Sequence, residues 1–414
     1  MNCDERGRGP GRAARRLKAI ALAATLALGA AGAGAAALPA LIQDAMSADP
    51  AILEARANEE VAGTRLESTR AQHLPVLGLQ AGGNVADPDK YYSTPFRGAV
   101  GKVNLYAAGA IDAAVERDEL RLQTQRLRTE ETGEKIAFEV ASLYLQALAA
   151  EELLAVEQAN LARHQKIIDD LEVIVANDLG RRYELAQADS RALQVRTRIA
   201  QLEKNRQVAL SRLTRYTRQP VTLANPFADD WQARLPAGAL TATHPALQAL
   251  EREAQSVRAD QSQLAKSRWP RIDLEAGVGN HSYARVVANW SFFDRSADYN
   301  VDSAAKQIVA AERRHDQMER ELAELSDTAQ ADMAKSQLQI KAAQAQIGAS
   351  AEVTRLYEMQ FKVGRRSLIE LVNAYAEQAS VEASRVQAQA DWRNAVLSYL
   401  RAHAALAGWA QAGR

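Results

Sequence analysis

Two stretches decide the fold, "HLPVLGLQAGGN" (73–84) and "RWPRIDLEAGVGN" (268–280). In each, a proline ends a helical run, and a segment follows in which apolar residues alternate with polar or small ones. Alternation with a period of two predicts a β-strand, and proline cannot continue a helix. Pro75 and Pro270 are separated by 195 positions, as are Pro50 and Pro245. The chain is therefore a tandem duplication.

Each copy predicts the same order of elements: helix, two strands, a long helix, a break and a further helix. The first helices are expected at about 41–72 and 245–268, and the long helices at 107–177 and 294–361. The breaks coincide with "GRR", which occurs at 180–182 and again at 364–366. We expect repeat 1 at 38–218 with its hairpin at about 76–106, a Pro-rich linker at 219–244, and repeat 2 at 245–410 with its hairpin at about 271–293.

The four predicted strands each have an apolar face and a polar face. In water they would pack one face on helices as a small domain, which is one interpretation. In lipid, an open four-stranded sheet leaves edge N–H and C=O groups unpaired, so the strands must close into a barrel with those of other chains. A polar inner face then suits a water-filled lumen, lined by Gln80, Lys102, Asp273 and Glu275.

The N-terminal residues 1–37 predict a secretory signal peptide, with a basic region followed by an Ala/Gly-rich apolar core. An uncleaved anchor helix is the alternative, because apolar character continues to Ile42. Cleavage removes six basic and two acidic residues from a chain with 51 of each, which leaves a net charge near −4 and gives no indication of nucleic-acid binding. The only cysteine, Cys3, leaves with the signal and lacks a lipobox. Aromatic residues make up only 5% of the chain, which favours long helices over a globular core.

Several motifs together resemble the TolC-like outer-membrane factor family over nearly the whole mature length. They are the signal peptide, the two repeats, "VNLYAAG" (103–109) after the first hairpin, and above all "LYEMQFKVGRRSLIELVNAYAEQ" (356–378). The resemblance implies a mainly α fold with a small β part: an α-barrel of long antiparallel coiled-coil helices, and four strands contributed to a trimeric twelve-stranded transmembrane β-barrel.

The resemblance also implies the function and the partners. A homotrimer would stand in the outer-membrane lipid of a Gram-negative cell and extend into the periplasm. It would serve as the passive exit duct for a periplasmic adaptor protein and an inner-membrane pump, ABC-type or proton-driven, in type I protein secretion or multidrug efflux. No catalytic residue, cofactor or metal is expected, since the six histidines are scattered without metal-ligand spacing. The alternative is a periplasmic adaptor-like coiled-coil scaffold without its own barrel, which leaves the alternating hairpins unexplained.

In the family, the helix after the second break lines the narrowest point of the tunnel. Matching "GRRSLIELVNA" by position places Arg366 on the linking basic residue, Glu370 on the first acidic ring and Asn373 on the second, with Phe361 in the same latch. An ordinary i,i+4 surface pair of Arg366 and Glu370 is the other interpretation. In the first repeat, Leu185 and Ala186 stand where the family often has polar latch residues.

The two breaks are expected to be helix–helix corners in which glycine supplies left-handed backbone angles. The resemblance makes them adaptor-docking corners, whereas a plain corner with solvated arginines is the simpler interpretation. The residues concerned are Gly180, Arg181, Arg182, Gly364 and Arg365.

Overall fold

The computed structural model describes residues 37–82, 96–217, 220–227, 231–234 and 243–412. The predicted signal peptide and the loop "VADPDKYYSTP" (85–95) lie outside these residues, apart from Ala37. The elements in chain order are α1 (Leu38–Ala48), α2 (Pro50–Arg70), β1 (Val76–Ala81), β2 (Arg97–Tyr106), α3 (Ala110–Asn177), α4 (Arg182–Leu213), α5 (Pro245–Lys266), β3 (Arg271–Gly279), β4 (Tyr283–Asn289), α6 (Arg295–Lys362), α7 (Leu368–Ala402) and α8 (Leu406–Ala412), with short 3₁₀ turns at Ala71–His73, Leu179–Arg181 and Trp231–Arg234.

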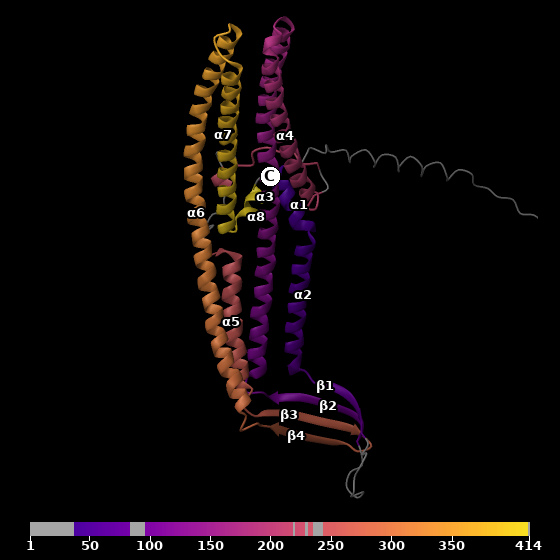
Figure 1. Ribbon diagram of the computed structural model, residues 1–414. Coiled ribbons are helices and arrows are strands. Elements are labelled where there is room, and N and C mark those ends of the chain that lie inside the picture. The colour runs from indigo at the N-terminus through magenta and orange to yellow at the C-terminus, as the bar shows by residue number, and fades with distance from the viewer. Residues whose placement is uncertain (1–36, 83–95, 218–219, 228–230, 235–242, 413–414) are drawn as a thin grey trace, which may run out of the picture.

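The chain forms a long rod of helices with the sheet at one end and both helix–helix corners at the other (Figure 1). The two long helices, α3 and α6, each have 68 residues. At about 1.5 Å per residue each helix spans roughly 100 Å. The predicted fold class, mainly helical with a small β part, is confirmed for the described chain.

The expected first helix, 41–72, is wrong in its boundaries, because two helices meet at Asp49. Pro50 is the first residue of α2, and the Asp49 side chain accepts a hydrogen bond from the Ala51 backbone N–H at 2.8 Å. Proline is favoured at the first helical position, where its missing N–H has no intrahelical partner. The aligned Pro245 opens α5 in the same way, with His244 accepting from Ala246.

Helix α1 explains why apolar character continues past the predicted cleavage site. Leu38, Leu41 and Ile42 are all 1% exposed or less and pack in the core at the middle of the rod. Trp409 of α8 and Phe227 of the linker contribute to the same core, with ring centroids 5.2 Å apart. The apolar residues that follow the predicted cleavage site are therefore part of the folded core.

The four strands form one antiparallel sheet in the order β1-β2-β3-β4. Each repeat supplies a hairpin, and β2 pairs with β3 to join the two hairpins. The expected second return strand, 283–293, ends early, since β4 stops at Asn289. Strands β1 and β4 are the two edges of this sheet, so each has one side without a partner in the described chain.

Candidate functional site

The second corner is closed by a left-handed glycine, as predicted. Gly364 has φ +74°, and its N–H donates to the Phe361 carbonyl at 2.9 Å. The next N–H, of Arg365, donates to the Gln360 carbonyl at 2.9 Å. These two bonds are the Schellman pattern, which satisfies the last carbonyls of a helix and favours glycine at the left-handed position.

The first corner is built differently, and the prediction of a left-handed Gly180 is wrong. Leu179–Arg181 form a 3₁₀ turn, and Gly180 is not among the described residues with positive φ. The Asp178 carboxylate accepts from the Gly180 N–H at 3.0 Å, so a side chain supplies the turn. The identical "GRR" letters therefore stand in two different backbone conformations.

Of the predicted docking residues, Gly180, Arg182, Gly364 and Arg365 are exposed and Arg181 is half-buried. The Arg181 guanidinium pairs with Glu184 at 2.6 Å, and its central carbon lies 5.8 Å from the centre of the Phe361 ring. Arg181 thus links the first corner to the second, and Phe361 itself is buried. Three exposed apolar side chains beside the corners were not predicted from the sequence, although their adjacency to the turns could have indicated them: Leu179, Tyr183 and Val363.

The predicted gate residues lie at the start of α7, where Glu370 has several partners. Its carboxylate accepts from the Arg366 guanidinium, and the Ser367 N–H and hydroxyl donate to it at 3.1 and 2.8 Å. This is a capping box, which satisfies free N–H groups at a helix N-terminus. The backbone and side-chain hydrogen bonds from Ser367, followed by that from Arg366, hold the pKa of Glu370 below its usual range. Glu370 is therefore ionised at neutral pH.

Arg366 is fixed by more than its i,i+4 partner. Its Nε donates to the Gln360 side-chain oxygen at 2.9 Å, and the guanidinium lies 4.2 Å from the centre of the Tyr357 ring. Asn373, one turn after Glu370, is exposed. In one chain, then, the pair is an i,i+4 pair within a helix cap, and its place in a constriction stays a prediction.

A seam between the two helical hairpins, α3–α4 and α6–α7, lies on the sheet side of the corners and was not predicted from the sequence. Arg163 of α3 donates two hydrogen bonds, of 2.8 and 3.1 Å, to the Glu382 carboxylate of α7. Both side chains are less than one-fifth exposed. The rings of His164 and Tyr375 meet edge to face with centroids 5.6 Å apart, and the Tyr375 hydroxyl donates to Glu358 at 2.8 Å. An apolar cluster surrounds them: Ile167, Ile168, Leu171, Ala188, Ala192, Phe361, Leu368, Leu371 and Val372.

The buried side chain of His164 predicts that this seam is sensitive to pH. The side chain is 2% exposed, and its Nδ1 has no hydrogen-bond partner in the described part of the chain. Burial lowers the pKa of His164, and the charges of Arg198, Arg163 and Arg191 lower it further, against Glu157, which raises it. The pKa of His164 is lower in the folded state than in the unfolded state. The contribution of the neutral side chain to the free energy of unfolding is therefore fully present above about pH 6.5, and it is lost as the pH falls towards the lowered pKa.

We expect amide hydrogen exchange in α7 near Tyr375 to accelerate between about pH 7 and pH 5.5, after correction for intrinsic rates, with a limiting slope of about 1.4 kcal/mol per pH unit. A His164→Phe variant keeps an aromatic ring against Tyr375 but cannot titrate, so it should lose this pH dependence. An equal pH dependence in the variant would assign the effect to other groups.

The predicted lumen residues share one face of the sheet. In the strand register Lys102 is opposite Glu275, and Glu275 is opposite Arg285. Gln80 is opposite Gly98, which lies four residues before Lys102 and therefore on the same face of β2. Asp273 lies two residues before Glu275 and shares its face of β3. Lys102 Nζ lies 3.1 Å from Asp273 and 3.4 Å from Glu275. Asp273, only 1% exposed in its side chain, also pairs with Arg271 at 3.0 Å. The charges therefore form a ladder across three strands.

The opposite face of the sheet is apolar and uncovered. Leu77 and Leu79 are 80% and 91% exposed, and Val278 and Val286 are 70% and 63% exposed. Strand register places all four on the face away from Lys102. A sheet with its polar face paired and its apolar face open is the reverse of what water favours.

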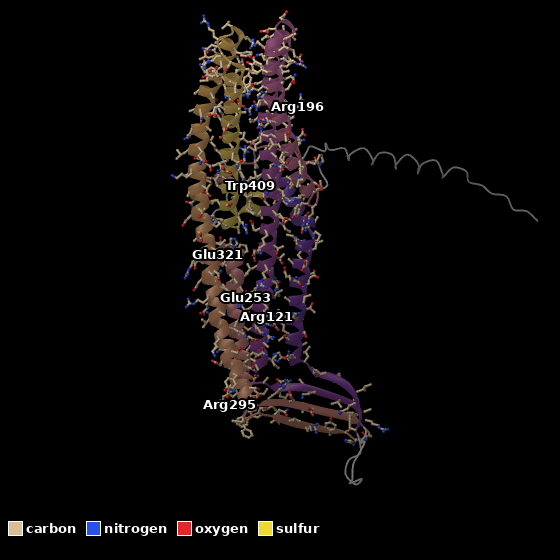
Figure 2. All side chains as sticks on the ribbon, viewed as in Figure 1. Arg121, Arg196, Glu253, Arg295, Glu321 and Trp409 are labelled. Atoms are coloured by element: carbon tan, nitrogen blue, oxygen red, sulfur yellow. The ribbon has the colours of Figure 1, made fainter. Side chains whose placement is uncertain are left out.

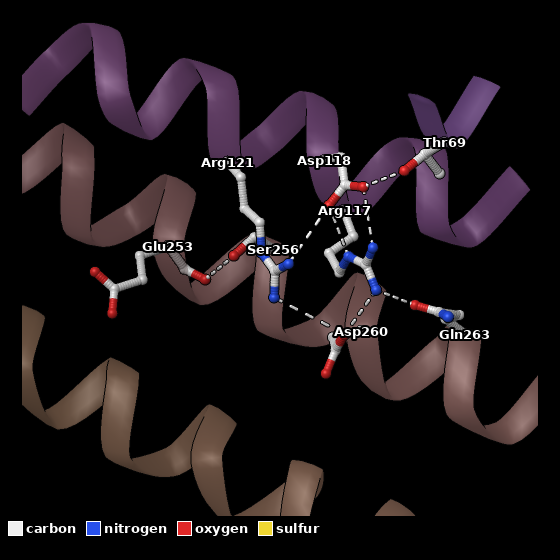
Figure 3. Close-up of polar contacts among 8 residues, drawn as sticks. All are labelled: Thr69, Arg117, Asp118, Arg121, Glu253, Ser256, Asp260 and Gln263. Carbon is white, nitrogen blue, oxygen red and sulfur yellow. Dashed lines mark hydrogen bonds and ion pairs between the residues drawn. The ribbon is translucent and has the colours of Figure 1, made fainter. Parts of the chain in front are cut away.

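Polar contacts also fix the helices next to the sheet (Figure 3). Asp118 of α3 accepts from Thr69 of α2 at 2.6 Å and from Arg117, and Arg117 reaches Asp260 of α5 at 3.2 Å. Burial alone would raise the pKa of Asp118, but the hydrogen bonds from Arg117 and Thr69 hold it below the usual value. Beside this network, a cavity of about 600 Å³ is lined by both charge signs, including Arg65, Arg128 and Glu253. These contacts hold α2, α3 and α5 together next to the sheet.

Among the described residues, no group of three or more His, Cys, Asp or Glu side chains is placed to hold a metal ion. Within the same part of the chain, no helix is both long and apolar enough to cross a membrane.

Residues 41–217 match the sequence profile of the family described as outer membrane efflux protein. This match confirms the resemblance to outer-membrane factors. The matched residues include most of α1 and the whole of α2, β1, β2, α3, the first corner and α4. No match is found among curated proteins.

Solved structures of outer-membrane channels share the fold. The outer-membrane channel OprN has a TM-score of 0.77 at 18% identity, with 90% of each chain covered. The outer membrane protein VceC from Vibrio cholerae has a TM-score of 0.77 at 15% identity, over 89% of this chain and 96% of that one. The open state of the MtrE channel from Neisseria gonorrhoeae has a TM-score of 0.72 at 17% identity, over 89% and 88%. At these identities the likeness shows the fold, which here extends over both repeats.

Proposed function

We propose that the protein is an outer-membrane efflux channel, the passive exit duct of a tripartite export system. The observation that carries the proposal is the sheet, whose exposed apolar face and ion-paired polar face are joined to a rod of roughly 100 Å. The apolar face suits lipid, the polar face suits an aqueous lumen, and the rod has the length to extend far from the membrane. The family profile and the similar channel structures support the same function.

Closure of the sheet requires further copies of the chain. In lipid, the free edges of β1 and β4 each leave unpaired backbone groups at a cost of several kcal/mol per group. Pairing β4 of one copy with β1 of the next removes every edge. Three copies give twelve strands, which agrees with the homotrimer that the family resemblance implies, and transmembrane barrels begin at about eight strands.

The corners and the gate take their roles from the same assembly. The corner end of the rod would meet the periplasmic adaptor, through Gly180, Arg181, Arg182, Gly364 and Arg365, and cargo would pass from an inner-membrane pump into the tunnel. Glu370 and Asn373, positioned by Arg366 and Phe361, would line the narrowest point. Energy comes from the pump, so the duct needs no catalytic residue, and the family and the similar structures are efflux proteins and channels. The cargo would be small molecules or secreted proteins.

Cell fractionation and light scattering test the proposal against the adaptor-like scaffold. We expect the protein in the outer-membrane fraction, released only by detergent, with a mass of about three protomers after subtraction of the detergent. A monomer released without detergent would favour the periplasmic scaffold instead.

A further inference from the structure

A cavity of about 600 Å³ lies in the half of the rod next to the sheet, among α2, α3 and α5. Figure 2 shows Arg121 and Glu253, two of its lining residues, at this level of the rod. Small-molecule sites in proteins have volumes of about 300–1,000 Å³, so the cavity has room for one small ligand. Its lining residues are separate from the corners, the candidate gate and the sheet.

The two carboxylates that line the cavity already have arginine partners outside the lining. Arg117 donates to both oxygens of Asp118, through Nε at 2.8 Å and Nη2 at 3.0 Å. Glu253 is shared between Arg128, which lines the cavity, at 2.7 Å and Arg314 of α6, which does not, at 2.9 Å. The negative charges of the lining are therefore compensated from outside it.

Two lining arginines, Arg65 and Arg121, retain unused donors. Among the residues that the structure describes, the Arg65 guanidinium has no ion pair or hydrogen bond. Arg121 lies 3.4 Å from Asp118 and 4.0 Å from Asp260, at the long end of ion pairing, and its side chain is 53% exposed. Figure 3 shows Arg121 extending from α3 towards Asp260 of α5.

The cavity and its immediate partners have an excess of positive charge. The arginines are Arg65, Arg117, Arg121, Arg128 and Arg314, and the carboxylates are Asp118, Glu253 and Asp260. Five positive charges against three negative ones leave an excess of two. A ligand that balances this excess is a small dianion.

We propose that this cavity binds a phosphate monoester, whose phosphate group is held by Arg65 of α2 and Arg121 of α3. The planar guanidinium group matches phosphate oxygens with two parallel N–H donors and stays charged at every physiological pH. A phosphate monoester carries a charge of about −1.5 to −2 at pH 7, which matches the excess of positive charge. Val61 and Val257, which also line the cavity, then contact the organic group of the ligand.

Phosphate monoesters occur both as soluble compounds and as lipid headgroups. Asp118 and Arg128 place the cavity roughly 12 to 27 Å along α3 from Ala110, at about 1.5 Å per residue. One headgroup layer of a bilayer is roughly 5–8 Å thick. With the sheet in the membrane, the cavity therefore lies beyond the headgroups, and a soluble monoester is the expected ligand. This choice of source rests on the proposed function, whereas the binding chemistry does not.

Equilibrium dialysis of the full-length protein in detergent tests the site, with radiolabelled inorganic phosphate as the probe. Ionic strength is held constant with chloride, because exposed charges also attract anions without a specific site. We expect one saturable phosphate per chain. Arg65→Met and Arg121→Met should each raise the Kd at least about tenfold, the effect of one hydrogen bond between charged groups. Arg65→Met removes no ion pair or hydrogen bond within the described chain, so it should unfold at the wild-type temperature in the absence of phosphate.

Arg126→Met is the matched control for the cavity. Arg126 also connects α3 to α2, through Glu59 at 3.1 Å, but it does not line the cavity. This variant should bind phosphate with the Kd of the wild type. Absence of saturable binding in the wild type, or an equal Kd in Arg65→Met and Arg126→Met, would overturn the proposal. The assay requires neither a bilayer nor ion conductance, so such a result would leave the proposed duct intact.

Competition with the labelled phosphate identifies the source of the ligand. Glycerol 3-phosphate, a soluble monoester, should displace the label completely, which supports a soluble ligand. Displacement by short-chain phosphatidic acid but not by glycerol 3-phosphate would support the phosphate site and assign it to a lipid headgroup instead.

Discussion

Glu370→Gln is expected to weaken block of the channel by multivalent cations on the order of tenfold or more, because three copies of this carboxylate around a narrow axis would form a site of high negative charge. Glutamine preserves the size of the side chain and its capacity to cap the helix at the third position. The variant therefore removes charge without removing the contact to Ser367, which the structure shows at 2.8 Å. Single-channel recording in a planar bilayer, with a multivalent cation added on either side, measures the block.

Two further variants make this prediction specific. Glu352→Gln removes an exposed carboxylate of α6 that pairs with Arg355 at 2.6 Å, and it should leave the block unchanged. Arg366→Ala removes the contacts to Gln360, Tyr357 and Glu370 together, and it should alter both conductance and block. Unchanged behaviour of Glu370→Gln and Arg366→Ala would exclude these residues from the constriction.

Arg163→Met is expected to raise the open population of the channel roughly tenfold, because it removes the ion pair with Glu382 that connects the helical hairpins α3–α4 and α6–α7. A charge-assisted ion pair that is partly shielded from water contributes about 1.5 kcal/mol, which corresponds to that factor. The variant also leaves Glu382 without its strongest partner, since the other donor to this carboxylate among the described residues is the Gln378 amide at 2.9 Å. The open population is measured as the fraction of time spent at high conductance.

Arg198→Met is the matched control for the seam. Arg198 of α4 pairs with Glu157 of α3 at 2.9 Å. Both residues belong to the helical hairpin α3–α4, so this pair does not connect it to α6–α7. The control should leave the open population close to that of the wild type. Equal effects of Arg163→Met and Arg198→Met would show that the seam has no special part in closure.

The sequence predicted the parts of the fold that depend on local patterns. Alternation around Leu77 and Ile272 located the strands, and heptad spacing located the long helices, because both signals depend on the period at which side chains return to one face. The register then places Gln80, Lys102, Asp273 and Glu275 on one face, as alternation predicted. Helix boundaries were less accurate at Asp49, although Pro50 carried the same signal that correctly opened α5 at Pro245.

Long-range side-chain pairs could not be predicted in this way. Arg163 and Glu382 are 219 residues apart, and no local period relates them. Position-by-position matching to the family indicated Leu185 and Ala186 of α4 as the latch positions of the first repeat, whereas Arg163 of α3 makes the polar connection. The conformation of Gly180 was missed because Asp178 builds the turn through its side chain, and three identical letters at the second corner suggested the same backbone.

The most direct test of the central claim is ion conductance of the purified full-length protein in a planar lipid bilayer. We predict discrete current steps of uniform size, carried by detergent-extracted particles of about three protomers and favouring cations. Insertion of the protein into the bilayer without any current step, or current from a monomer alone, would contradict the account of a trimeric outer-membrane duct.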